Sequence, residues 1–467
     1  MEALSDCHCH LLHFASESAH ESQSVRAVLS RAHEKGVRRV VAVPEYPEEI
    51  LPVSYLSESF PCVTDEFPQV SACAGLHPIQ GSYDDLSRAR SLTPLDVSLC
   101  LESIRKSLET GAVGVEEVGL DFTPKFLEAS VLNQRLASLS PEECVSTLGV
   151  SLDLLDREAQ QFLSQKKIAN MEKQTSVGEG QGGSGPSNAE TLTQSLTGAE
   201  RAVLRARALQ VLSLRKQLSL AVEFGGLPVN LHSRSAGPHV LREVLEAWER
   251  FGDAWPSSEQ FTKGAAVGVS HSPSGRSMKE LAGLKSGEVF LSEKRKGTQA
   301  ASAGGALQPP FSAHFHAPGL SLKDALRAVS VAPDSVFFSV PPSFTKGSSL
   351  SPLFCPSEVI QREGEGEKGS GATSKRKKKK KTGPGPLPSS CLLLETDAPA
   401  LGREPAEVAL SLEWLQRIRG DTRERGEAES EGYSLEEKNS FTITALDLEQ
   451  NAVRAYGEVR MSGEMNR

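Results

Sequence analysis

Residues 6–10 read Asp-Cys-His-Cys-His, and these five positions decide how the whole chain is interpreted. Successive side chains of an extended strand point to opposite faces, so His8 and His10 would share one face and the two cysteines the other. A zinc knuckle that combined cysteine and histidine ligands would need both faces at once. We therefore expect the histidines to point into a common pocket, and Cys7 and Cys9 to pack outward against helices as small apolar residues.

Short apolar runs alternate with amphipathic stretches through the rest of the chain. Strands are predicted at residues 36–43, 70–75, 111–117, 227–232, 336–340 and 391–395. Helical periodicity lies between them, at residues 24–35, 95–109, 200–224 and 239–250. Strands that alternate with helices form βαβ units, and about six to eight such units favour a closed barrel over an open sheet. Since the sequence has neither the glycine fingerprint nor the phosphate loop of nucleotide-binding folds, we predict an α/β fold of the TIM-like (β/α) barrel type.

Polar, low-complexity stretches interrupt this pattern. Residues 176–200, for example, are rich in glycine, serine and threonine, and such a composition cannot bury a core. We therefore predict one barrel domain over residues 1–460, with disordered insertions at residues 126–200, 254–308 and 346–387.

The composition excludes several classes of protein. The chain has 467 residues and a net charge of −9, so no global positive charge draws it to nucleic acid. Its eight cysteines form no C-x-x-C pair, and a disulfide framework is not expected in a chain of this length. The first residues are not those of a signal peptide, and no apolar run approaches the about 20 residues of a membrane span. We expect a soluble protein of the cytoplasm, the nucleus or both.

Titratable side chains follow the predicted strands where those strands end. They are, in chain order, His8, His10, Glu117, His232 and Asp397. The C-terminal strand ends of a parallel barrel meet at one rim, so we expect these groups to share a pocket. An isolated H-x-H pair fits ordinary core or surface histidines better than a metal site, and the later strand ends are what favour a metal site. Imidazole and carboxylate ligands without a thiolate suit Zn²⁺, Mn²⁺ or Mg²⁺.

Six motifs resemble, in the same order, the signatures of the TatD family. They are DCHCHL (6–11), GLHP (75–78), GVEEVGLDF (114–122), PVNLHSRSAG (228–237), FFSVPPSF (337–344) and LLLETDAPAL (392–401). TatD proteins are metal-dependent hydrolases, classed as deoxyribonucleases, with a TIM-barrel fold. The HSRSAG and FFSVPPS wording is most similar to the eukaryotic TatD-domain-containing type 3 subgroup. The resemblance covers roughly residues 1–124, 205–250, 311–345 and 388–456, and not the predicted insertions.

The resemblance implies a site with two divalent metal ions. By position, His8 and His10 match the first ligand pair of the family. Glu117 matches the carboxylate that bridges the two ions, and His232 matches a ligand of the second ion. Asp397 matches a ligand of the first ion that can also hold the attacking water.

The family has one more histidine ligand, at the end of the sixth strand, in a pattern like H-A-F-D-G. His314 needs one inserted residue to match this pattern, and His316 needs one deletion. His271 has the expected gap before Gly275 and is a third candidate. We prefer His314 and His316, because FFSVPPSF follows them as the next strand. Alternation places both on one strand face, so either could reach a metal.

Four further polar residues flank the expected ligands. Glu116 is expected to be structural, because the family spacing to VGLD selects Glu117 as the ligand. Glu395 would support a ligand by hydrogen bonding. His77 would either line the substrate mouth or cap a turn before a proline. Arg234 would either hold a substrate phosphate, whose geometry a guanidinium matches, or form an ion pair at a helix start.

A lysine and arginine run lies at residues 375–381, inside a polar stretch at 361–389. It fits a nuclear localisation signal, a flexible tether that contacts a phosphate backbone, or a solvated loop without a specific role. If this run is a tether close to Asp397, its deletion should make DNA binding weaker and less dependent on salt concentration.

The resemblance implies hydrolysis of a phosphodiester, with DNA as the expected partner and 3′ ends as the expected point of attack. In that reaction Asp397 would orient or deprotonate a metal-activated water. Two other interpretations stay open on sequence alone. The same metal barrel could hydrolyse amides or lactones, or the chain could be a scaffold with a degraded site.

Overall fold

The computed structural model describes most of the predicted barrel. The described residues are 3–15, 23–81, 89–128, 154–159, 161–162, 197–252, 309–346, 351–354, 386–429 and 443–459. Most of the three predicted insertions lies outside these ranges, as do His271 and the basic run at 375–381. The extent of the domain therefore stays a prediction.

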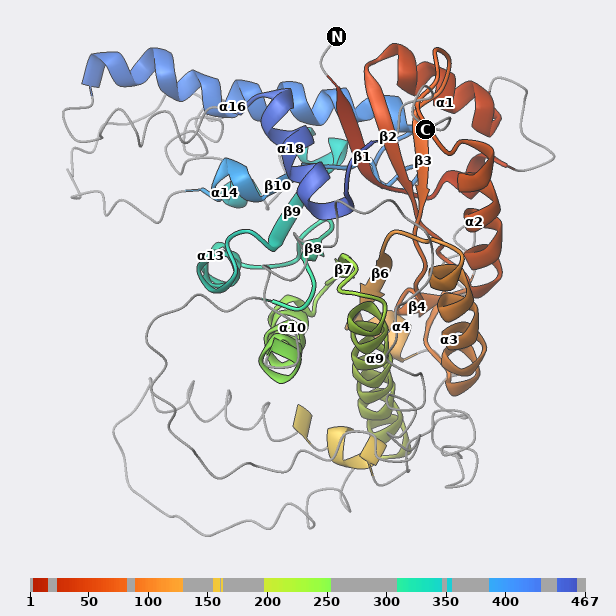
Figure 1. Cartoon of the computed structure of the whole chain (residues 1–467). Coiled ribbons are helices and arrows are strands. Elements are labelled where there is room, and N and C mark those ends of the chain that lie inside the picture. Colours follow the sequence, from red (N-terminus) through yellow and green to blue (C-terminus); the bar gives the residue numbers. More distant parts are fainter. Residues whose placement is uncertain are drawn as a thin grey trace.

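Eight parallel strands form a closed ring, and the expected TIM-like barrel is confirmed (Figure 1). One sheet has the order β1-β2-β3 and the other the order β10-β9-β8-β7-β6. Parallel bridges from Ala74 to Val115 and from Cys9 to Ala398 join the two sheets at both edges. The strands are β1 (Leu4–Cys9), β2 (Val37–Ala42), β3 (Gln69–Ala72), β6 (Val115–Gly119), β7 (Val229–His232), β8 (Ala313–Phe315), β9 (Val336–Val340) and β10 (Leu392–Leu394). A short antiparallel pair, β4 (Ile79–Gln80) and β5 (Arg90–Ser91), stands apart from the ring.

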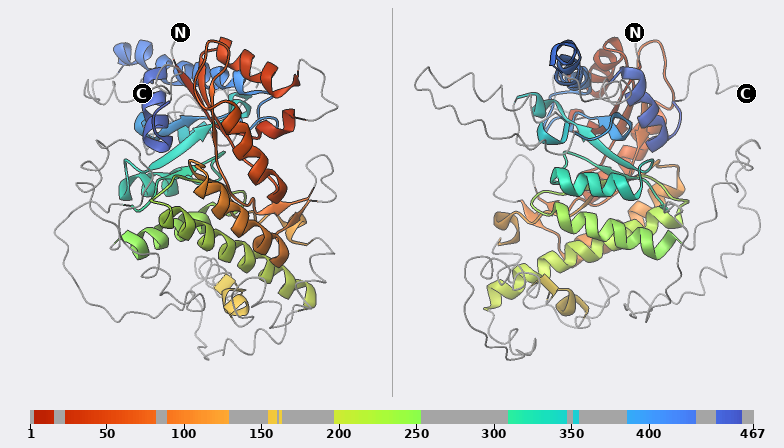
Figure 2. Two further views of the ribbon diagram at one scale, coloured as in Figure 1. Left: turned by 45° about the vertical axis from the view of Figure 1, so that its right-hand side comes forward. Right: turned by 90° about the vertical axis from the view of Figure 1, so that its left-hand side faces the viewer.

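Helices surround the strands, as Figures 1 and 2 show. The longer ones are α1 (Val25–Glu34), α2 (Ile50–Ser59), α3 (Pro94–Glu109), α9 (Gly198–Glu223), α10 (Gly237–Gly252), α13 (Leu322–Val331), α16 (Val408–Glu429) and α18 (Ala445–Tyr456), and two short ones are α4 (Pro124–Leu127) and α14 (Ser351–Phe354). Local sequence explains where they begin. The Thr93 hydroxyl and the Asp96 carboxylate form a reciprocal capping box at the start of α3, for example, and a proline occupies the first turn. In the described part of the chain, no helix combines the length and the apolar character that crossing a bilayer requires.

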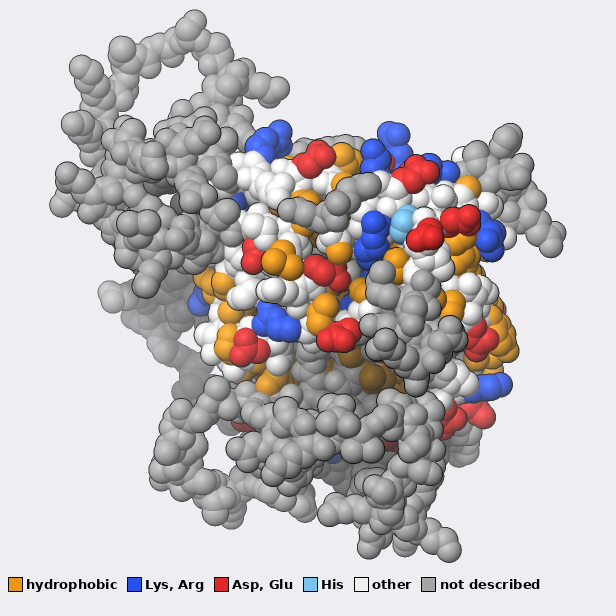
Figure 3. Space-filling view, turned by 45° about the horizontal axis from the view of Figure 1, so that its top comes forward, with side chains coloured by type: hydrophobic (Ala, Val, Ile, Leu, Met, Phe, Trp, Pro, Cys, Tyr) orange, Lys and Arg blue, Asp and Glu red, His pale blue; other side chains and the backbone are white. Residues whose placement is uncertain are grey.

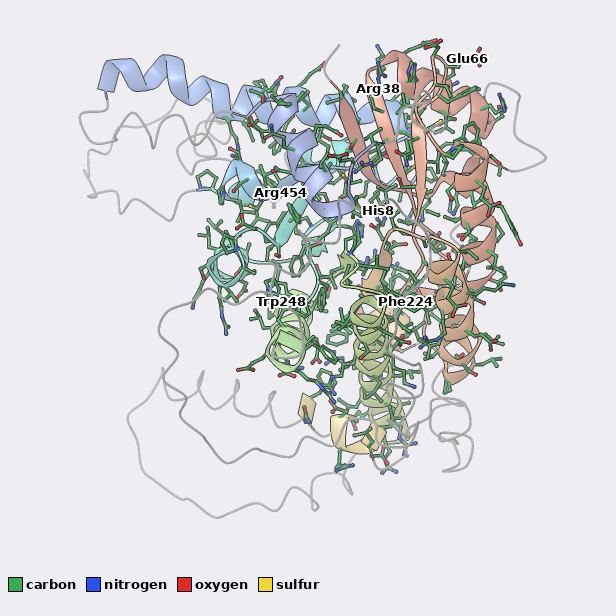
Figure 4. The ribbon with its side chains drawn as sticks, viewed as in Figure 1. His8, Arg38, Glu66, Phe224, Trp248 and Arg454 are labelled. Atoms are coloured by element: carbon green, nitrogen blue, oxygen red, sulfur yellow. The ribbon has the colours of Figure 1, made fainter. Side chains whose placement is uncertain are left out.

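The core has two layers. The larger layer lies between the strands and the helices, and it includes Trp248 of α10 (labelled in Figure 4). The smaller layer fills the inside of the barrel with Cys7, Val41, Val43, Cys73, Phe337 and Leu393, together with Ala452, Ala455 and Tyr456 of α18. Two hydrogen bonds from the Arg39 guanidinium, to the carbonyls of Ala452 and Gly457, fasten this last helix to β2. The C-terminal helix therefore supplies part of the barrel interior.

The prediction that both cysteines of the opening motif face outward is wrong for Cys7. Cys9 packs in the outer layer, but Cys7 lies in the inner layer with the side chains of Phe337 and Tyr456. The register of β1 against β2 slips between Asp6 and Cys9, which is the mark of a β-bulge. Strict alternation fails there because one extra residue is inserted into the strand.

Candidate metal centre

The ends of β1, β6 and β10 bring four of the expected ligands together in a buried cluster. His8 Nε2 lies 3.9 Å from a carboxylate oxygen of Glu117 and 3.7 Å from one of Asp397. His10 Nε2 lies 3.5 Å and 3.3 Å from oxygens of the same two acids. All four residues are at most 6% exposed. The labelled His8 lies near the middle of the molecule in Figure 4, where these strands converge.

A second group lies on the other side of Glu117. His77 Nε2 is 3.7 Å from Glu117 Oε1 and 3.4 Å from His232 Nδ1. His232 Nδ1 is in turn 3.3 Å from His316 Nε2, and the His316 ring stacks on that of His8 with centroids 4.3 Å apart. Glu117 and His316 thus join the two groups into one constellation.

Three sets of side chains among the described residues have spacing that suits a metal ion. They are His8 with His316 and Asp397, His8 with His10 and Glu117, and His77 with Glu117 and His232. Several of their atoms have no hydrogen-bond partner, namely both ring nitrogens of His8, Nδ1 of His10 and Oε2 of Glu117. Buried polar atoms are rarely left in this state. A divalent cation would give His8 Nε2 and Glu117 Oε2 a partner, and this donor set of imidazoles and carboxylates fits such an ion.

Unusual backbone geometry orients the two acids. Glu117 has φ of 55° and Asp397 has φ of 47°, in the left-handed region that non-glycine residues rarely adopt. The register of β6 against β7 also slips between Val115 and Val118, so β6 carries a bulge at its paired glutamates. Strained residues of this kind concentrate at functional sites. The alternation of side chains in the sequence does not predict the strained backbone of either residue.

Hydrogen bonds hold the imidazoles of the second group. His77 Nδ1 lies 2.7 Å from the Ile79 carbonyl oxygen, which can only accept, so Nδ1 carries the proton and Nε2 presents its lone pair to the cluster. His232 Nε2 faces Asp121 at 3.4 Å, and the Asp121 carboxylate also accepts a 2.7 Å bond from Arg234 Nε. Partners of this kind fix the orientation of metal-binding imidazoles.

Glu395 fixes the orientation of the His316 ring in the same way. Its Oε2 lies 3.6 Å from His316 Nδ1, and it accepts a bond from the Ser339 hydroxyl at 2.5 Å. Its Oε1 accepts a bond from the Ala317 amide at 2.9 Å. The expected supporting position of Glu395 therefore agrees with its contacts.

The charges of the cluster shift its pKa values in opposite directions. Burial would raise the pKa of Glu117, but the neighbouring His10 and His77 hold that pKa well below the usual range of a glutamate. Burial lowers the pKa of His77 to about 4. For His316, burial is outweighed by the Glu395 carboxylate, so its pKa is raised to about 9. The ionised carboxylates therefore favour positive charge beside them, which a bound cation would supply in place of imidazole protons.

The structure does not bring every expected residue to the cluster. His314 lies on β8 but in none of the three metal-binding sets, and its Nδ1 contacts the amide of Asn230 at 3.0 Å and the hydroxyl of Tyr456 at 2.6 Å. His316 reaches the cluster because it follows the end of β8 rather than lying within it. Side-chain alternation predicts that His314 and His316 share one face of the strand. It does not predict that only His316 lies at the same level along the barrel axis as the other ligands.

Arg234 forms an ion pair, which is one of the two roles considered for it. Its Nε is engaged by Asp121, while its side chain is 53% exposed and its guanidinium lies over the Phe126 ring at 5.2 Å. Sequence reasoning missed Asp121 itself, which joins His232 to Arg234. The available signal was an acid four residues after the end of the predicted strand, in VGLD.

No family model matches the chain. Among curated proteins it is similar to "Putative deoxyribonuclease tatdn3" of Danio rerio, with 38% identity over 130 residues, which are 28% of this chain and 42% of that protein. It is 34% identical to "Deoxyribonuclease TATDN3" of Homo sapiens over 123 residues, 26% of this chain and 40% of the human protein. The expected resemblance to type 3 TatD proteins is confirmed by these matches. The chain spans less than half the length of the curated relatives that it matches.

Solved structures show more distant likeness. A TatD homolog from Escherichia coli, YJJV, aligns over 97% of this chain and 98% of its own with 15% identity and a TM-score of 0.45. An uncharacterized amidohydrolase from Saccharomyces cerevisiae aligns over 98% and 100%, with 12% identity and a TM-score of 0.42.

Proposed function

We propose that this chain is a metal-dependent hydrolase that cleaves phosphodiester bonds of DNA. The observation that carries the proposal is the buried constellation around Glu117. Its imidazoles and carboxylates come from separate strand ends and face one another at 3.3–3.9 Å, and His8 Nε2 and Glu117 Oε2 have no hydrogen-bond partner. The names of the curated relatives, which are deoxyribonucleases, support DNA as the substrate. The free, buried state of the six described cysteines fits a reducing compartment, the cytoplasm or the nucleus.

The proposed ligands form two sets that share Glu117. His8, His10 and Asp397 would hold one ion, and His232 and His316 the other. His77 has the geometry of an additional ligand, because its Nε2 faces Glu117 and His232. When bound, the two ions would lower the pKa of a shared water and stabilise the charge that develops on the phosphate. The close approach of His316 to His232 favours a complete site over the degraded one of a scaffold.

Residues of the chain would do the remaining work. Asp397 would accept the proton of the attacking water, since its Oδ1 lies among the proposed ligands at 3.3 Å from His10 Nε2. Arg234 is held at Nε by Asp121, and its exposed guanidinium would contact a phosphate of the substrate. Attack from a 3′ end, as in a 3′–5′ exonuclease, is the finer part of the proposal.

Cleavage of end-labelled single-stranded DNA in Mn²⁺ or Zn²⁺ tests the proposal. Glu117→Ala and Asp397→Ala should each lower the rate by about 100-fold or more, the scale on which groups that stabilise developing charge contribute. Glu102→Ala on α3 is the matched control, because the Glu102 side chain is exposed and its removal should leave the rate unchanged. Substrates labelled at the 3′ and the 5′ end separate the two directions of digestion. If wild type cleaves only amides or lactones, or no substrate at all while metal is bound, the proposed activity is wrong.

A further inference from the structure

The carboxylate of Glu116 lies directly behind the proposed metal ligand His8. Its Oε2 is 3.4 Å from His8 Nδ1, on the side of the ring away from Glu117 and Asp397. Both residues are fully buried. The sequence offers Glu116 only as a neighbour of Glu117, and the bulge in β6 lets both glutamates turn into the barrel.

Two further side chains act on the same carboxyl group. The Tyr456 hydroxyl and the Cys73 thiol both interact with Glu116, although neither of its oxygens has a hydrogen bond of standard geometry. Tyr456 is the last residue of α18, and its side chain lies in the inner layer of the barrel. The C-terminal helix thus reaches the metal centre through one buried acid.

The Tyr456 hydroxyl is itself held by His314, whose Nδ1 lies 2.6 Å away. If the Asn230 amide is turned so that its oxygen faces His314, one assignment of protons satisfies the chain of contacts: His314 Nδ1–H donates to the Asn230 and Tyr456 oxygens, and Tyr456 O–H donates toward Glu116. In the same assignment His8 Nδ1–H donates to Glu116, which leaves His8 Nε2 with its lone pair toward Glu117 and Asp397. This gives a use to His314, which none of the metal-binding sets contains.

We propose that Glu116 and Tyr456 are positioning residues for His8: Glu116 fixes the tautomer and direction of the His8 ring, and Tyr456 holds Glu116. The inference rests on the proposed metal-binding role of His8. A carboxylate behind a metal-binding imidazole raises its basicity and prevents rotation of the ring, and removing such a partner commonly weakens metal binding about 10–100-fold. Tyr456 acts only through Glu116, so its removal should cost less.

The test is Zn²⁺ affinity of the full chain, measured by competition with a chromophoric chelator. Glu116→Gln keeps the size of the side chain but cannot become a carboxylate, and it should weaken Zn²⁺ binding about 10–100-fold. Tyr456→Phe should weaken binding less. Glu102→Gln on α3 and Tyr55→Phe on α2 make the same chemical changes at exposed side chains, and both should bind Zn²⁺ like wild type.

A double variant separates positioning from general damage to the fold. If Tyr456 acts through Glu116, the Glu116→Gln/Tyr456→Phe protein should bind Zn²⁺ no more weakly than Glu116→Gln alone. The visible absorption spectrum of the Co²⁺-loaded protein should change in Glu116→Gln and Tyr456→Phe, because it reports on ligand geometry. Equal unfolding temperatures of the metal-free variants and wild type show that the fold is kept, and if Glu116→Gln does not fold, Tyr456→Phe carries the test.

Two results would overturn the inference. In the first, Glu116→Gln has the Zn²⁺ affinity and the Co²⁺ spectrum of wild type. If only Tyr456→Phe folds, the same result in that variant overturns the inference. The other is a pair of affinity losses that add in the double variant. Failure of the proposed function looks different, because wild type itself would then bind no Zn²⁺.

Discussion

Replacing Gly119 with alanine tests how closely β6 and β7 must approach to place His232. The added Cβ would lie 2.1 Å from the His232 carbonyl oxygen and 3.0 Å from the carbonyl carbon and the amide nitrogen of the same residue. These atoms belong to the backbone and cannot rotate away. Gly119 also has φ of +149°, so alanine there is strained at a cost of about 1–3 kcal/mol. Moving β7 to relieve the overlap would break the 3.0 Å bond from the Leu120 amide to His232, worth about 0.5–1.5 kcal/mol.

We therefore expect Gly119→Ala to lower the free energy of unfolding by about 3 kcal/mol or more, measured by urea denaturation of the metal-free protein. Zn²⁺ affinity should fall as well, because His232 must move with its strand. Gly111→Ala is the control: Gly111 has φ of +106° but no atom within 4 Å of the added Cβ, so it carries the backbone strain alone. Equal stability losses in the two variants, with wild-type Zn²⁺ affinity in Gly119→Ala, would refute the steric argument.

Three further outcomes follow from the geometry. Phe337→Ala empties a fully buried position inside the barrel and should cost about 3–5 kcal/mol of unfolding free energy in the same urea assay, while loss below 1 kcal/mol would contradict the packing described. Arg234→Lys keeps the positive charge but replaces the planar guanidinium, which can donate two parallel hydrogen bonds to a phosphate. Steady-state kinetics should show a raised KM for DNA with kcat near that of wild type. Chelation should lower the melting temperature, since metal at 100 times its Kd stabilises the fold by about 2.7 kcal/mol, and identical melting curves with and without EDTA would exclude a tightly bound ion.

The barrel itself could be predicted because its signal is repeated. Apolar runs at 36–43 and 336–340, for example, became β2 and β9 within a residue or two of the expected bounds. The predicted strands 111–117, 227–232 and 391–395 also end at Glu117, His232 and Glu395, which lie at the same rim. Periodicity averages over many residues, so a single irregularity does not erase it.

The details of the site could not be predicted because they depend on single residues. The bulge between Asp6 and Cys9 reverses the facing of Cys7, and nothing in the pattern DCHCH marks it. Side-chain alternation also does not predict the position of a residue along the barrel axis. It therefore cannot distinguish His314, inside β8, from His316, just beyond the end of β8. Register and bulges are tertiary properties that a period-2 pattern does not encode.

One sequence feature does carry information about a bulge, although only a physical argument extracts it. Glu116 and Glu117 are adjacent acids within a strand whose every residue is buried. In a regular strand one of them would point at the helices, into a layer made of apolar side chains, where an unpaired carboxylate costs several kcal/mol. A bulge removes that cost, because both acids then face the inside of the barrel and lie beside the imidazoles of His8 and His10. Adjacent acids in an otherwise apolar barrel strand thus predict a bulge, and the bulge gives the two carboxylates different tasks: Glu117 faces the metal-binding cluster, and Glu116 stands behind His8.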